Sequence, residues 1–207
     1  MRWPLMLFLL ATIVPVFFGK VRAAPLWLAV QAVALAWAGL IHHAEWSWHS
    51  LSGVLEVLLV RGVLAPLLLQ RAIHRCAQPD TDLMPSNLFS WAIGLGLMAL
   101  AFDFGGAAMA DGPALALGVV AATVILVLLI LSTNTAPAAQ LVAVLFMENA
   151  MAVFESMLTA PWPLPVHLML TGVYLLTVGV GSWLVGHPDS LASASGPPPA
   201  RARESGP

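Results

Sequence analysis

The segment LFMENAMAVFESMLTA, residues 145–160, is apolar enough to lie in a membrane, yet it carries two glutamates, Glu148 and Glu155. They are seven residues apart, which is about two helical turns, so both carboxylates fall on nearly the same face of a helix. A charge at the centre of a bilayer costs about 2.5–3.5 kcal/mol on insertion scales, so such residues usually face a partner or a water-filled path. The segment therefore predicts a membrane helix whose acidic face meets other polar groups.

The composition extends this reading to the whole chain. Of the 207 residues, 60% are hydrophobic and only 9% are charged, whereas soluble domains average about 25% charged residues. Long apolar runs recur along nearly the entire length, as expected for membrane helices. The sequence therefore predicts an all-α, polytopic transmembrane helix bundle.

A bilayer core about 30 Å thick takes about 20 helical residues to cross. By this measure the sequence predicts seven spans, at residues 3–19, 24–42, 50–70, 87–104, 114–132, 138–159 and 165–186. We expect the first to be a retained helix rather than a cleaved signal peptide, because Lys20 and Arg22 follow its apolar core as a stop-transfer flank would. Residues 1–187 then form one transmembrane domain, and residues 188–207, rich in Pro, Ser and Gly, a disordered tail.

Basic residues predict the orientation of the spans. Six of the eight lie in segments that share one side of the seven-span layout: Lys20, Arg22, Arg71, Arg75, Arg201 and Arg203. Because basic residues are retained on the cytoplasmic side, this distribution places the carboxyl terminus in the cytoplasm and the amino terminus outside.

Four ionisable residues lie well inside the predicted spans, Glu56 and Arg61 in the third and Glu148 and Glu155 in the sixth. Counted from the outer span ends at about 1.5 Å per residue, Arg61 and Glu148 share the midplane, and the other two share a layer nearer the outer surface. If the two helices are neighbours, a buried Arg–Glu pair lies beneath a carboxylate pair. Such a set either pins helices together or passes protons.

Other classes of site find little support. No GxxxxGK[ST], GxGxxG or HExxH motif occurs. The single cysteine, Cys76, excludes an all-cysteine iron–sulfur site within this chain, and no basic patch suggests nucleic acid. His42 or His43 could join His167 around a b-type haem, but histidines beside tryptophans at helix ends fit an interfacial belt better. We expect no cofactor and no metal.

Two short segments resemble a known family. LVRGVLAPLLLQ, residues 59–70, is similar to the basic-residue-then-proline segment of component E, the small membrane subunit of the hydrogenase-4 and formate-hydrogenlyase group. Arg61 stands where lysine is typical, and Pro66 follows it five residues later. LFMENAMAV, residues 145–153, resembles that family's Met-Glu-Asn-Gly helix and a helix of the K subunit of respiratory complex I, whose intramembrane glutamate aligns with Glu148. Chain length and the seven-helix layout also suit component E.

The resemblance implies a non-catalytic subunit in a prokaryotic inner membrane, without metal, flavin or iron–sulfur cluster. Its partners would be antiporter-like subunits and the membrane anchor of an energy-converting complex. Its role would be to contribute to proton or ion translocation, or to its coupling, through Glu148 and Arg61, with Glu155 and Glu56 as secondary residues.

One position departs from the family. Its last helix usually carries an acidic residue after a threonine, whereas here Thr171 is followed by Gly172. This difference gives weight to a peripheral or structural version of the role. The alternatives are a stand-alone ion or small-solute transporter and a purely structural scaffold.

Overall fold

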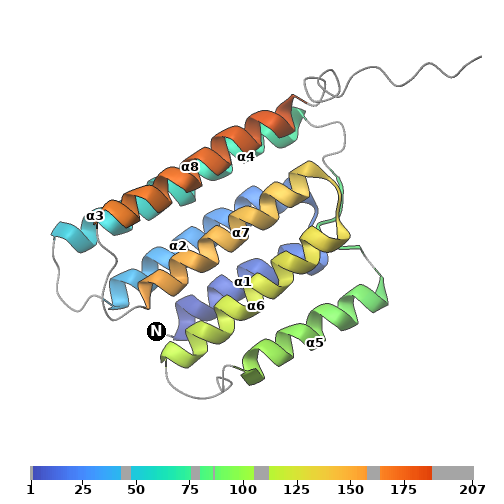
Figure 1. The fold of residues 1–207 in the computed structure, drawn as a ribbon, viewed down its shortest axis with the longest axis horizontal. Coiled ribbons are helices and arrows are strands. Elements are labelled where there is room, and N and C mark those ends of the chain that lie inside the picture. Colours follow the sequence, from blue (N-terminus) through green and yellow to red (C-terminus); the bar gives the residue numbers. More distant parts are fainter. Residues whose placement is uncertain are drawn as a thin grey trace, which may run out of the picture.

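The computed structural model describes residues 2–42, 48–75, 80–85, 87–104, 112–157 and 164–187. Almost all of them are helical, and Figure 1 shows the helices gathered in one bundle. The helices are α1 (Arg2–Phe18), α2 (Ala24–His42), α3 (Trp48–Glu56), α4 (Ala65–Arg75), α5 (Leu88–Phe104), α6 (Gly112–Thr133), α7 (Pro137–Ser156) and α8 (Leu164–Gly186), with a short 3-10 turn η1 (Val21–Ala23) and a π-helix η2 (Val57–Leu64). The predicted all-α bundle is confirmed.

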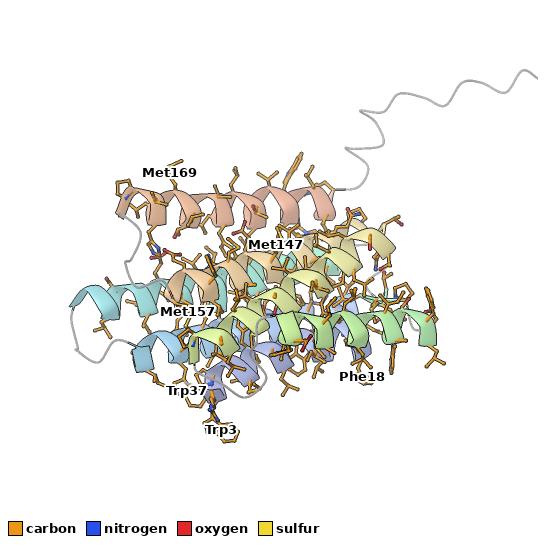
Figure 2. The ribbon with its side chains drawn as sticks, turned by 60° about the horizontal axis from the view of Figure 1, so that its bottom comes forward. Trp3, Phe18, Trp37, Met147, Met157 and Met169 are labelled. Carbon is orange, nitrogen blue, oxygen red and sulfur yellow. The ribbon has the colours of Figure 1, made fainter. Side chains whose placement is uncertain are left out.

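Since α3, η2 and α4 follow one another without a break, these elements form seven rods. Five stretches are long and apolar enough to cross a membrane: Val21–Ile41, Leu51–Arg75, Gly112–Thr133, Pro137–Ser156 and Pro165–Gly186. The remaining two rods, α1 and α5, are apolar but shorter. Large apolar side chains also cover the outside of the bundle, where Trp3, Trp37 and Met169 lie at the periphery (Figure 2). This is the pattern of a multi-pass membrane protein.

The rods are arranged in layers. The α3–η2–α4 rod lies beside α8, α2 beside α7, and α1 beside α6, with α5 packed on the outer side of α6 (Figure 1). The core runs through these layers, and α5 contributes Ala101 to it. Its fully enclosed side chains include Leu28 of α2, Leu69 of α4, Leu126 of α6, Phe146 of α7 and Tyr174 of α8.

Small residues let some rods approach closely. A methyl group added at Gly181 of α8 would meet the side chain of Leu141 of α7. At Gly179, two residues earlier on the same helix, the same addition would meet open space. The Leu141 side chain thus packs directly against the backbone of α8 at Gly181, and close packing at small residues is a main source of helix association in lipid, where no hydrophobic effect drives it.

The π-helix lies in the middle of the third rod and carries Arg61. Pro66 has no backbone N–H, and in a regular α-helix its ring would clash with the carbonyl of Gly62, four residues earlier. The wider π turns accommodate the ring, and the N–H of Ala65 bonds to the carbonyl of Val60, five residues back. π-Helical turns are rare in proteins, and those that occur are often found at functional sites.

Residues 80–85 close one end of the bundle. Leu83 is fully buried. The backbone N–H of Val21, in the α1–α2 turn, donates to this segment at 2.9 Å. From the α6–α7 turn, Nδ2 of Asn134 donates to the backbone carbonyl of Asp82 at 2.8 Å. The segment thus joins two turns that are more than a hundred residues apart in sequence.

Candidate functional site

Arg61 reaches from η2 to α7 and α8. Its Nη1 donates to the backbone carbonyl of Glu148 at 3.1 Å and to Oδ1 of Asn149 at 3.0 Å. Its guanidinium carbon lies 4.1 Å from the centre of the Tyr174 ring, which places the cation over the negative face of the aromatic system. The third and sixth predicted spans therefore meet at the level expected from depth counting.

The contact differs from the expected ion pair. Within the described part of the chain, the Glu148 carboxylate makes neither a hydrogen bond nor an ion pair with Arg61. Successive residues of an α-helix project about 100° apart, and it is Asn149, fully buried, that projects toward Arg61. The Glu148 carboxylate attracts the guanidinium electrostatically without touching it.

A line of hydrogen bonds continues from Asn149 across the bundle. Nδ2 of Asn149 donates to Oε1 of Gln31 in α2 at 3.0 Å, and Nε2 of Gln31 donates to Oγ1 of Thr12 in α1 at 2.7 Å. The Thr12 hydroxyl donates in turn to the carbonyl of Phe8. Asn149, Gln31 and Thr12 are fully enclosed, so each of these bonds satisfies a polar group that water cannot reach. Together with Arg61 they connect four rods.

A second group of polar side chains lies at the other predicted level. Nδ1 of His167 is 3.0 Å from Oε1 of Glu155, and its Nε2 is 3.1 Å from Oε2 of Glu56. The Thr171 hydroxyl donates to the second oxygen of Glu56, Oε1, at 2.5 Å. We call Glu56, His167 and Glu155 the Glu–His–Glu triad. The two glutamates expected as a carboxylate pair are thus joined by an imidazole between them.

Local helix geometry explains this convergence. Glu56 is the last residue of α3, and Glu155 lies in the last turn of α7. His167 and Thr171 are four residues apart near the start of α8, so they lie on one face of that helix and both reach Glu56. The triad is partly exposed, with 36% of the His167 side chain, 31% of Glu56 and 19% of Glu155 accessible.

His167 is the site residue that sequence reasoning did not select, because a histidine near a predicted span end was interpreted as a polar helix terminus. The available signal was its depth, near the outer end of the seventh span and hence near the layer of Glu56 and Glu155. A threonine one turn further on strengthened that signal. Neither feature reports helix rotation, which decides whether the side chains meet.

Of the histidines considered for a haem, only His167 has a described side chain. The side chains of His42, His43 and His49 lie outside the described residues, as does the predicted tail at 188–207. Both ring nitrogens of His167 face carboxylates. In the described segments no group of three or more His, Cys, Asp or Glu is arranged to hold a metal ion.

A scan against protein-family models and searches of curated proteins and of solved structures found no match to this chain. The resemblance to component E therefore depends on two short segments, residues 59–70 and 145–153. These segments meet in space, because Arg61 of the first donates to Glu148 and Asn149 of the second.

Proposed function

We propose that this chain is a non-catalytic membrane subunit of an energy-converting complex of the kind that includes complex I and the hydrogenase-4 group, and that it contributes to proton or ion translocation or to its coupling. The observation that carries the proposal is the set of ionisable side chains gathered between membrane-spanning helices. We call this set the charged seam; it consists of Glu56, Arg61, Glu148, Glu155 and His167.

The charge balance of the seam supports a proton-handling role. A set that only pins helices together needs matched charges, because an uncompensated charge in low dielectric is expensive. Here three carboxylates accompany one guanidinium and one imidazole, and the carboxylates of Glu148, Glu56 and Glu155 all interact electrostatically with Arg61. The seam is therefore not a set of matched ion pairs, and carboxylates and imidazoles are groups that can bind and release protons.

Glu148 supports membership of a larger assembly. Its side chain is only half-buried, and its carboxylate has no hydrogen-bond partner among the described residues. A carboxylate at mid-depth in a membrane is stable when a second subunit or water meets it. The proposed partners are antiporter-like and membrane-anchor subunits in a prokaryotic inner membrane, with the amino terminus outside and the carboxyl terminus in the cytoplasm.

A structural scaffold is the second candidate, and one observation favours it. The line from Arg61 through Asn149 and Gln31 to Thr12 is fully hydrogen-bonded and connects four rods. These are the properties of a device that fixes helix positions. The scaffold assigns function to this line, whereas the coupling proposal assigns it to the carboxylates.

The proposal is tested by isolating a carboxy-terminally tagged copy from its native host in mild detergent and identifying what accompanies it by mass spectrometry. Antiporter-like subunits are expected in the eluate, and their companions identify the chemistry that is coupled. A monodisperse eluate of this chain alone would contradict the subunit proposal and would favour a stand-alone transporter.

A further inference from the structure

We propose that the Glu–His–Glu triad, together with Thr171, is a binding site for one exchangeable proton, with His167 as the group that shares protons between the two carboxylates. The inference rests on the proposed function and deepens it, because it names the proton as the ligand and locates its site at the end of the charged seam. It is carried by geometry, namely the two ring nitrogens of one imidazole facing two carboxylates from two other rods.

The number of hydrogens in the triad follows from its contacts. A nitrogen and an oxygen at 3.0–3.1 Å need a hydrogen between them, since two facing lone pairs would repel. The two contacts of His167 therefore hold two hydrogens. Either the ring is an imidazolium between two carboxylates, or it is neutral and one glutamate is protonated. Both arrangements contain two titratable protons and carry a net charge of −1.

A place for a third proton lies on the far side of Glu56. Its Oε1 accepts a hydrogen bond from the Thr171 hydroxyl, and a hydroxyl both donates and accepts. When Oε1 takes up a proton, Thr171 can rotate to accept from it and donate to a carbonyl of its own helix, as threonine does in helices. The triad then has no net charge. The site thus alternates between two and three protons without breaking a contact.

Two features of the surroundings act on this exchange, the nearby charges and the exposure of the triad to water. The next acid on α7 is Glu148, which lies two turns deeper than Glu155, or about 10 Å along the helix. From η2 Arg61 attracts the carboxylates of Glu56 and Glu155. The basic residues of α4 begin at Arg71, fifteen residues or about 22 Å along the rod from Glu56. Arg61 is five residues from Glu56 along the rod, and its attraction opposes protonation of the carboxylates, whereas the partly exposed position lets protons exchange with water.

The test is pH-difference infrared spectroscopy of the full chain reconstituted in lipid nanodiscs. Among the bands of the other acids, lowering the pH should produce one carboxylic-acid C=O band that Glu56→Gln removes. Thr171→Val should move that band to higher frequency, because the acid proton loses its acceptor, and Thr171→Ser should leave it in place. Thr177→Val, a threonine on the same helix outside the triad, and Asp103→Asn, an exposed acid in α5, are the matched controls and should leave the band unaltered.

The imidazole is examined separately by ¹⁵N magnetic resonance of histidine-labelled protein in lipid, with His167 assigned by the loss of its signals in His167→Gln. Both ring nitrogens should show strong hydrogen bonds, whereas the exposed His74 should show ordinary exchange with water. A band that survives Glu56→Gln, a band insensitive to Thr171→Val, or a His167 ring with one free nitrogen would overturn the inference. Because these measurements need only the isolated chain, they can fail while the partner subunits still co-purify. Equally, they can succeed when no partner subunit co-purifies, so the failure of this inference and the failure of the proposed function are distinguishable.

Discussion

The guanidinium of Arg61 donates a hydrogen bond to the side-chain oxygen of Asn149 at 3.0 Å, across 88 residues of sequence. The sequence predicts that Arg61 pairs with the Glu148 carboxylate, whereas the structure gives Arg61 other partners. The positive charge is held by an amide, a backbone carbonyl and the Tyr174 ring, and the Glu148 carboxylate makes no hydrogen bond to it. The contacts that fix the helices and the carboxylate to which we assign a proton-handling role therefore lie on neighbouring but different side chains.

Glu148→Gln should abolish proton-coupled activity of the assembled complex while leaving its assembly intact. An amide keeps the shape of the carboxylate but cannot take up a proton, and the backbone carbonyl that accepts from Arg61 is unchanged. The measurement is proton translocation by the complex in vesicles, with Asp103→Asn as the control that retains activity. Loss of the whole complex in Glu148→Gln would instead support the scaffold.

Arg61→Ala should destabilise the bundle, and Arg61→Lys should largely preserve it. Alanine leaves Oδ1 of Asn149, fully buried, without its donor, and an unsatisfied buried group costs about 1–3 kcal/mol. Lysine keeps a positive charge near the Tyr174 ring and can donate to one of the two oxygens. Thermal unfolding in detergent compares the two variants. Equal melting temperatures for both would show that the contacts of Arg61 do not stabilise the fold.

Gln31→Leu should lower the free energy of unfolding by about 1–3 kcal/mol. In the core it leaves the Asn149 side-chain amide without its acceptor and the Thr12 hydroxyl oxygen without its donor. The exposed glutamine Gln70 provides the control, and Gln70→Leu should have little effect. Adding Thr12→Val to Gln31→Leu should recover part of the loss, since removing both partners leaves fewer unsatisfied groups. Chemical denaturation in detergent measures all three. A double variant with the summed loss of its parts would argue against the hydrogen-bonded line.

Gly181→Ile should weaken the packing of α8 on α7, whereas Gly179→Ile should be tolerated. The first substitution drives a side chain into Leu141, and the second projects it into open space. Overpacking of this kind costs about 1–3 kcal/mol, and both variants share the same intrinsic helix preference. Their difference in melting temperature therefore isolates the close approach, and two identical values would exclude it.

Most of the fold could be predicted from the sequence because membrane helices are governed by length and polarity. The apolar runs predicted seven spans; the described chain contains seven helical rods, five of which are long and apolar enough to cross a membrane. The largest difference is in the third, where the predicted end at residue 70 falls short of Arg75. The helix continues beyond its apolar part through Arg71, His74 and Arg75, which hydropathy assigns to a loop although they are compatible with a helix.

The sequence predicts how deep the site residues lie along their helices, but not how each helix is rotated about its axis. Counting along the spans placed Arg61 level with Glu148 and Glu56 level with Glu155, and each of these levels contains a polar cluster. The identity of the contacts depends on which way each helix faces, and a difference of about 100° exchanges Glu148 for Asn149. His167 was missed for the same reason. Helix rotation is set by packing such as that at Gly181, which no single sequence displays.

Residues 80–85 have a consequence for how the polypeptide is made. The α1–α2 hairpin is synthesised before residues 80–85, which bond to its turn, and Asn134, which bonds to residues 80–85, is synthesised later still. Closure of that end is therefore a late event that waits for the end of the fifth rod, α6. The buried Leu83 also makes this loop a poor place to insert a tag or split the chain, since tolerance follows the burial of the backbone rather than its position between helices.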